Sequence, residues 1–137
     1  KKLSNLLTRK SKALLVGFNI VLKKTAEIIY NTPVVIIVYN TEELSKKTKK
    51  FQEPYFSIVK ISEVQSISAA IENMLLMAQS YGLGAAWLTA PLFCGKEIAA
   101  LVNIKGLVVA IVTIGYPNGD CFVTTNRFPP NNLVRFL

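Results

Sequence analysis

Few side chains in this 137-residue chain are able to do acid–base, nucleophilic or metal chemistry. The sequence has no histidine, which excludes imidazole metal sites, a histidine general base and Ser–His or Cys–His nucleophilic pairs. Its two cysteines, Cys94 and Cys121, have no spacing typical of metal or redox motifs. Cys94 would be nucleophilic only if its surroundings lowered its pKa, so a buried, unreactive thiol is the favoured interpretation. We therefore predict no catalytic side chain and no metal site, and an enzyme of this composition needs a bound cofactor.

The positive charge lies in the first half of the chain. Residues 1–60 contain 12 Lys or Arg and 4 Glu, whereas residues 61–137 contain four charged residues of each sign, so the first part carries the whole net charge of +8. A basic region can attract nucleic acids or anionic cofactors. Thirteen of the basic residues are lysines, however, and aromatic residues do not alternate with them. A solvated lysine-rich face is the favoured interpretation, and we predict no nucleic-acid partner.

The length of the chain suits one domain over residues 1–137. No apolar stretch is long enough to span a membrane, and the opening residues lack the form of a secretory signal. These features predict a cytoplasmic protein without a membrane partner. Because residue 1 is not methionine, the sequence is interpreted as a processed chain or as part of a longer one.

A predicted helix over residues 63–81 organises the chain. One face is apolar at helical spacing, with Val64, Ile67, Ile71, Met74, Leu75 and Ala78. The other face is hardly more polar, so this helix is expected to be covered on most sides. Ser62 is predicted as its N-cap, Glu63 suits the positive end of the helix dipole, and Gly82 is expected to end the helix at positive φ.

The remaining elements follow from apolar blocks and turn residues. Gly17 and Pro33 separate the first elements, and Thr41 is a suitable N-cap. A loop is expected at 51–60, where Phe51, Tyr55 and Phe56 suggest packing against another surface. We predict helices at 2–15, 20–31, 41–50 and 95–103, buried strands at 34–39, 84–90 and 107–116, and an extended apolar tail.

Twelve residues of the later part resemble the nitroreductase family. They match a helix-to-strand run "A-x-x-N-x-L-L-A-A-x-x-L-G-L-G-x-x-W" and a closing "G-Y-P", and they are Ala70, Asn73, Leu75, Leu76, Ala78, Gly82, Leu83, Gly84, Trp87, Gly115, Tyr116 and Pro117. The resemblance implies an α+β fold: a small mixed sheet flanked by helices, with a long central apolar helix and an extended C-terminal tail. The family's N-terminal "R-R-S-x-R" and "P-S-x-x-N" segments do not occur here. The chain therefore resembles a single nitroreductase-like domain that lacks the family's N-terminal segment.

The resemblance also implies a site and an activity. Carried over position by position, Trp87, Leu88, Thr89 and Ala90 lie along an FMN ring. The small residues Gly84, Ala85, Ala86 and Ala90 let a planar ring approach the backbone. Arg127, followed by Phe128-Pro129, matches the family's phosphate-binding position. The family's activity passes hydride from NAD(P)H through flavin to a nitroaromatic, quinone or similar small-molecule acceptor. Its members are homodimers that share long helices and crossing tails.

Three alternatives remain open from the sequence. In the first, the small residues of the strand serve only to let it cross the central helix, and Arg127 makes a surface ion pair. A second possibility is a non-catalytic flavin-binding or structural homologue that has lost the phosphate-binding arm. A third is an incomplete chain whose missing segment restores activity.

Overall fold

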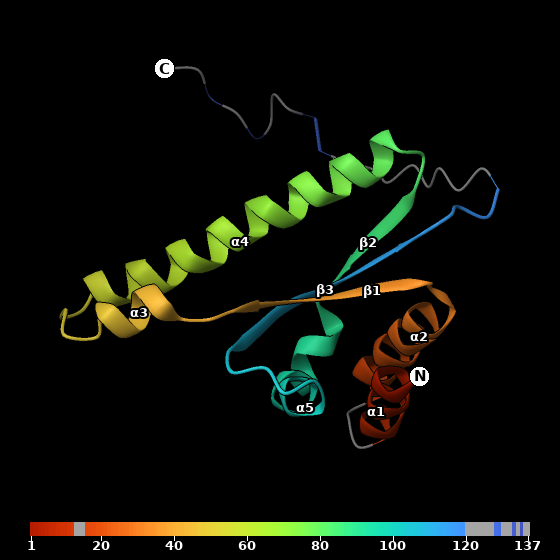
Figure 1. Cartoon of the computed structure of the whole chain (residues 1–137), viewed down its shortest axis with the longest axis horizontal. Helices are drawn as coiled ribbons and strands as arrows, with labels where there is room; N and C mark the ends of the chain where they lie inside the picture. Colours follow the sequence, from red (N-terminus) through yellow and green to blue (C-terminus); the bar gives the residue numbers. More distant parts are fainter. Residues whose placement is uncertain (13–15, 120–127, 130–132, 134, 136–137) are drawn as a thin grey trace.

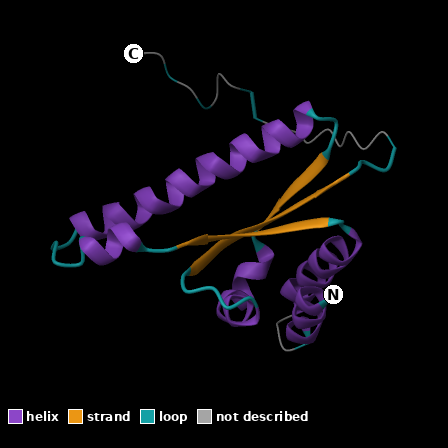
Figure 2. Ribbon diagram, in the orientation of Figure 1, coloured by secondary structure: helices purple, strands orange, loops and turns teal. Residues whose placement is uncertain are grey.

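A computed structural model describes residues 1–12, 16–119, 128, 129, 133 and 135 of the chain. In these residues one three-stranded sheet lies between a long helix on one side and several shorter helices on the other (Figures 1 and 2). The elements in chain order are α1 (Lys2–Ser11), α2 (Val16–Asn31), β1 (Val34–Asn40), α3 (Glu43–Lys47), α4 (Tyr55–Ser80), β2 (Gly84–Leu88), the 3₁₀ helix η1 (Ala90–Cys94), α5 (Gly95–Leu101) and β3 (Leu107–Gly115).

Strand β3 is the centre of the sheet, with β1 on one side and β2 on the other. Both pairings are antiparallel, with Val34 opposite Ile114 and Gly84 opposite Gly115. The described sheet is therefore antiparallel, where a mixed sheet was expected. Strand β2 stops at Leu88, opposite Ile111, so the first residues of β3 pair with β1 alone.

A β-bulge in β3 changes which side chains face each layer. Tyr39 pairs with Val108 and Val38 with Ala110, so Val109 is the extra residue. Because of this extra residue, Val108 packs in the core under α1, α2 and α5, while Ala110 packs under α4. Without the bulge, two residues separated by one position would point to the same face.

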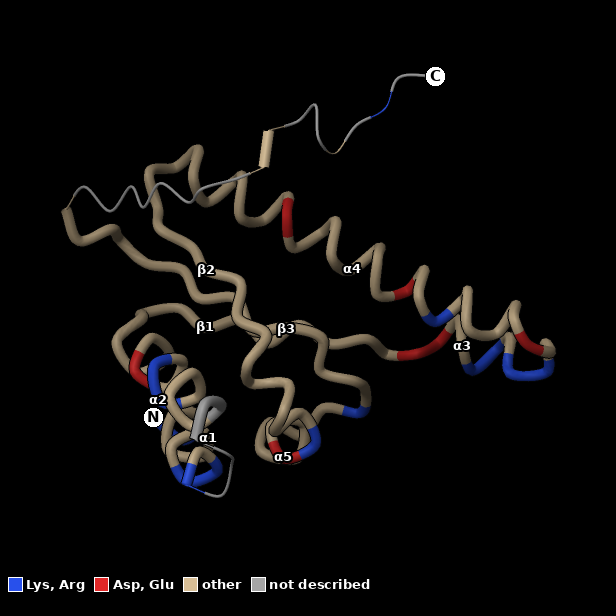
Figure 3. Tube along the Cα trace, turned by 180° about the vertical axis from the view of Figure 1, so that it is seen from behind, with Lys and Arg blue, Asp and Glu red and all other residues tan. Residues whose placement is uncertain are grey.

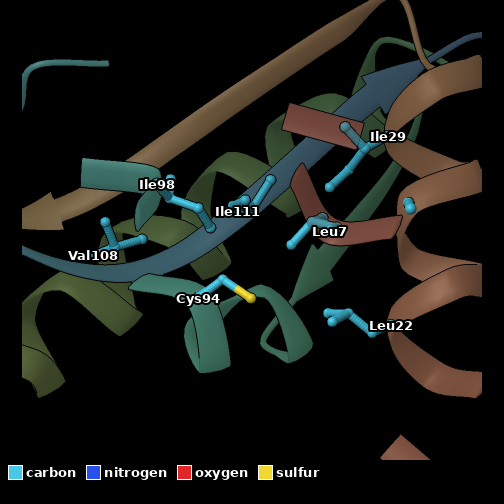
Figure 4. Close-up of a cluster of buried hydrophobic side chains, with 8 residues drawn as sticks. Leu7, Leu22, Ile29, Cys94, Ile98, Val108 and Ile111 are labelled. Atoms are coloured by element: carbon cyan, nitrogen blue, oxygen red, sulfur yellow. The ribbon is translucent and has the colours of Figure 1, made fainter. Parts of the chain in front are cut away.

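Two apolar clusters hold the layers together. The first joins α1, α2, η1 and α5 to the sheet, and Figure 4 shows its members converging from these elements: Leu7, Leu22, Ile29, Cys94, Ile98, Val108 and Ile111. The second joins α4 to the opposite face through Ile71, Ala110 and Val112. The strands carry no Lys or Arg, which lie instead on the helices and the loops next to them (Figure 3).

The long helix differs most from its prediction, because it begins at Tyr55 rather than at residue 63. Ser62 is not its N-cap: its hydroxyl donates to the carbonyl of Ile58 inside the helix. Pro54 precedes the first turn, and the Ser57 N–H donates to the Glu53 carboxylate at 3.3 Å. The expected loop at 51–60 is therefore confined to residues 51–54, and residues 55–60 belong to the helix. The aromatic side chains of Phe51 and Tyr55 are exposed.

Most of α4 is also less covered than expected. In the described single chain only Ile71 and Ala78 of this helix are buried, because α4 packs mainly against the sheet and the short helix α3. Gly82 does end the helix region at φ +69°, as predicted. None of the helices in the described part of the chain is long and apolar enough to cross a membrane.

Smaller corrections concern element ends. Gly17 lies within α2, and residues 13–15 of the predicted first helix lie outside the described residues. The short helix begins at Glu43, after Glu42 rather than Thr41, because Asn40 accepts the Glu42 N–H and turns the chain there. The expected strand at 84–90 ends at Leu88, since Pro91 cannot donate to a strand ladder and instead enters η1. The last helix stops at Leu101.

Candidate functional site

The four residues predicted to lie along a flavin ring fall where β2 passes into η1. Trp87 and Leu88 are the last residues of the strand, and their side chains point to opposite faces. Trp87 packs in the cluster under α4, and Leu88 packs against the cluster under α1 and α2. Both side chains are partly buried and pack against the core clusters, so neither lines the hollow that the next two residues form.

Thr89 and Ala90 do line a hollow. We call it the α2–η1 hollow; it measures about 480 Å³ and is lined by Val21, Thr89, Ala90, Leu92 and Phe93. Thr89 is exposed, and apart from its hydroxyl the lining side chains are apolar. Its volume falls in the range of small-molecule sites.

The backbone adds a polar group at the same place. Ala90 is the first residue of the 3₁₀ helix, so its N–H has no acceptor within that helix. Pro91 comes next and has no N–H. The Thr89 carbonyl already accepts the Leu92 N–H at 2.9 Å. The groups at this turn that suit a ligand's polar edge are therefore the Thr89 hydroxyl and the Ala90 N–H.

The small residues that were expected to extend this slot lie elsewhere. Gly84, Ala85 and Ala86 line a separate hollow of about 250 Å³ at the other end of β2, together with residues of the α2–β1 turn and the end of β3. The structure thus separates two groups of residues that the sequence placed in one slot. Arg127, the expected phosphate ligand, lies outside the described residues, and so does Cys121.

Cys94 is buried at the end of η1, with 0% of its surface exposed. Burial raises the pKa of its thiol, the nearby Glu97 carboxylate raises this pKa further, and Lys10 opposes both effects. The thiol is therefore held in its protonated, unreactive form, as the sequence predicted. Lys10 forms an ion pair with Glu97 and lowers the pKa of that carboxyl group.

Glu63 has a role that the sequence did not indicate. Its carboxylate accepts hydrogen bonds from the Ser45 N–H at 3.0 Å, from the Ser45 hydroxyl, and from the Asn40 amide at 3.0 Å. The Ser45 and Asn40 side chains lower its pKa to about 2. Glu63 thus ties α4 to α3 and to the end of β1. Within the described residues, no group of three Asp, Glu, Cys or His side chains is arranged to hold a metal ion.

The comparison with protein families assigns this architecture. A model described as "Nitroreductase family" matches residues 1–116, so the chain belongs to the nitroreductase family. A protein of Archaeoglobus fulgidus described as "Putative NADH dehydrogenase/NAD(P)H nitroreductase" is 35% identical over 80 residues, which make up 53% of this chain and 45% of that protein. The chain therefore spans less than half the length of that relative.

Solved structures show the same fold. A "BluB-like flavoprotein" of Clostridium difficile 630 superposes with a TM-score of 0.69 at 22% identity, over 99% of this chain and 73% of that one. A "Nitroreductase Family Protein" of Streptococcus pneumoniae TIGR4 gives a TM-score of 0.67 at 13% identity, over 99% and 89% of the two chains. These neighbours confirm the predicted α+β fold of nitroreductase type.

Proposed function

We propose that the chain is an FMN-dependent oxidoreductase of nitroreductase type that uses NAD(P)H to reduce a small nitroaromatic, quinone or similar acceptor. The observation that carries the proposal is the α2–η1 hollow, which places Thr89 and Ala90 at an apolar opening in the segment where the family resemblance expects the flavin ring. Family membership and the name of the archaeal relative support the same chemistry.

The residues at this hollow fit a flavin ring. Val21, Leu92 and Phe93 supply apolar walls for a planar ring. The Thr89 hydroxyl and the Ala90 N–H supply hydrogen-bonding groups for the polar edge. Arg127 is proposed for the phosphate, since a guanidinium donates two charge-assisted hydrogen bonds to it.

When bound, a flavin supplies a two-electron relay between the nicotinamide and the acceptor. For a nitro compound the overall reaction is NAD(P)H + H⁺ + RNO₂ → NAD(P)⁺ + RNO + H₂O. This chain's own residues are proposed to bind and orient the reactants and to exclude water. No side chain has to act as a general acid or base, in agreement with the absence of histidine and the buried state of Cys94.

We also propose that the chain works as a homodimer. The face of α4 that points away from the sheet is apolar and exposed, with Leu76 60%, Ile61 56% and Ile58 53% exposed. An obligate dimer needs such an apolar face. Leu76→Glu should give a folded monomer, measured by light scattering and circular dichroism. A wild-type chain that is itself a folded monomer would contradict this part of the proposal.

The functional proposal is tested by filling the α2–η1 hollow. Val21 lines it and is 52% exposed, whereas Ile20, the neighbouring residue on the same helix, is 55% exposed and does not line it. Val21→Trp should weaken FMN binding at least tenfold, and Ile20→Trp should leave it nearly unchanged. Quenching of flavin fluorescence measures both affinities, and NAD(P)H oxidation with an added nitroaromatic should fall in parallel.

Three results have different meanings. If Val21→Trp and Ile20→Trp weaken FMN binding equally, the flavin ring does not lie in this hollow. If FMN binds but NAD(P)H oxidation does not follow, the chain is the non-catalytic flavin-binding homologue that the sequence left open. If the wild-type chain binds no flavin, the structural alternative is correct for this chain.

A further inference from the structure

A second hollow lies on the other side of Leu92. We call it the β3-edge groove; it measures about 440 Å³ and its lining residues are Val64, Leu92, Gly95, Lys96, Gly106, Leu107, Val108 and Val109. These residues come from α4, from the η1–α5 segment and from the start of β3 (Figure 1). Leu92 also lines the α2–η1 hollow, so the two hollows share a wall.

The groove exists because the sheet is incomplete at this point. Strand β2 ends opposite Ile111, so no strand pairs with the outer side of β3 at residues 107–110 among the described residues. The bulge at Val109 falls in the same stretch. Bulges are frequent where a strand has to re-aim a side chain beside a site. A Cβ at Gly95 would lie 3.9 Å from the Cβ of Val108, so these two lining residues are close neighbours.

The lining is apolar apart from one cation. Three exposed large apolar side chains from three different elements meet here: Val64, Leu92 and Leu107. Lys96 is the only charged side chain among the lining residues, and it is exposed. Among the described residues it is not part of an ion pair, although its charge helps to lower the pKa of the adjacent Glu97, whose ion-pair partner is Lys10. An apolar groove with one exposed ammonium group is complementary to a flat apolar molecule that carries one negative charge.

From this geometry we infer that the β3-edge groove is the acceptor subsite and that it favours aromatic acceptors bearing a carboxylate, with Lys96 binding the carboxylate. The inference rests on the proposed function, because it is the shared Leu92 wall that brings the groove next to the flavin hollow. The aromatic ring would lie against Val64, Leu92 and Leu107, and the anionic end at Lys96. A ligand with several phosphates would leave charges without partners in this lining, so a monoanion fits better.

The test compares two ligands of nearly the same shape, 4-nitrobenzoate and the neutral 4-nitrobenzamide. Calorimetric titration into the full chain should show the benzoate binding about threefold to fivefold more tightly at low salt, which is the range of an exposed ion pair. Lys96→Gln should remove this preference without changing the affinity for the amide. Lys105→Gln is the matched control, since Lys105 is exposed on the adjacent loop outside the lining and should keep the preference.

A blocking variant tests the location of the site. Val64→Trp should weaken both ligands, whereas Ser66→Trp, on the same helix and outside the lining, should weaken neither. With FMN and NAD(P)H present, Lys96→Gln should raise the KM for 4-nitrobenzoate by the same factor and leave the KM for the amide unchanged.

Several results would overturn the inference. These are equal binding of the two ligands by wild type, the same loss of preference in Lys105→Gln, or undiminished binding in Val64→Trp. An unchanged KM for 4-nitrobenzoate in Lys96→Gln would likewise show that the acceptor does not bind in this groove. A parallel titration with FMN separates these results from failure of the proposed function, because a chain that binds FMN but shows no benzoate preference contradicts only the inference about Lys96.

Discussion

Replacing Glu63 by Gln should destabilise the protein in a pH-dependent way. The carboxylate of Glu63 accepts three hydrogen bonds from Ser45 and Asn40, and these bonds depend on its negative charge. If the whole lowering of the pKa from 4.5 to about 2 contributed to the free energy of unfolding, it would correspond to about 3.4 kcal/mol. Because Glu63 is partly exposed, solvent screening reduces the expected effect to about 1–2 kcal/mol.

The pH dependence of this stabilisation follows from the lowered pKa of Glu63. The folded state holds Glu63 ionised more strongly than the unfolded chain does, so its contribution is complete above pH 4.5 and is lost as the pH falls towards 2. Glu63→Gln should therefore lower the melting temperature by about 3–7 °C at pH 7, and the difference from wild type should be largely lost as the pH falls to about 2.

The assay is thermal and urea unfolding of wild type and variant at several pH values, followed by circular dichroism. Glu72→Gln is the matched control: Glu72 is an exposed residue of the same helix and should give no pH-dependent difference. Ser45→Ala should reproduce much of the effect, because the Ser45 hydroxyl is the largest cause of the shift. A destabilisation of Glu63→Gln that stays the same from pH 7 to pH 2 would refute this account of the bond between α4 and α3.

Three further predictions concern the core and the turns. In a Cys121→Ser background, Cys94 should react with a thiol reagent only at the rate of unfolding, and rapid reaction of the native protein would show that its thiol is accessible. Gly106→Ala should destabilise by more than about 2 kcal/mol, because its Cβ would lie 2.4 Å from the Asn40 carbonyl oxygen; a melt like that of wild type would show that β1 and this loop do not approach so closely. Gly82→Val should cost more than about 1 kcal/mol because of its φ of +69°, whereas Gly82→Asn should be tolerated better; equal melts would mean that the helix does not end there.

The sequence predicted the elements whose signals are local. The β-branched block at the start of β1 and the apolar run of β3 are strands, and the chain does turn at Gly82. The start of α4 was misplaced because residues 55–60 have no clear apolar period, and Ser62 and Glu63 look like a helix start when they are considered alone. Glu63 gains its hydrogen-bond donors only when β1 and α3 lie next to it in the folded chain. No local sequence pattern indicates that contact.

The candidate site was predicted only in part. Thr89 and Ala90 do line a hollow, and this was expected from the family resemblance rather than from the residues. The sequence could not separate these two residues from Trp87 and Leu88, whose alternation in β2 packs the two side chains against opposite core clusters. The β3-edge groove depends on where β2 stops and on a bulge at Val109, and both are set by tertiary pairing.

The central claim is that this chain holds FMN at the β2–η1 turn with Arg127 on the phosphate. It is tested most directly by titrating FMN and riboflavin, which lacks the phosphate, into wild type and Arg127→Ala. A charge-assisted hydrogen bond contributes about 1.5–3 kcal/mol, so the variant should bind FMN roughly 10- to 150-fold more weakly and riboflavin as well as wild type does. If the wild-type chain bound neither ligand, or if the variant lost both equally, the measurement would contradict the claim.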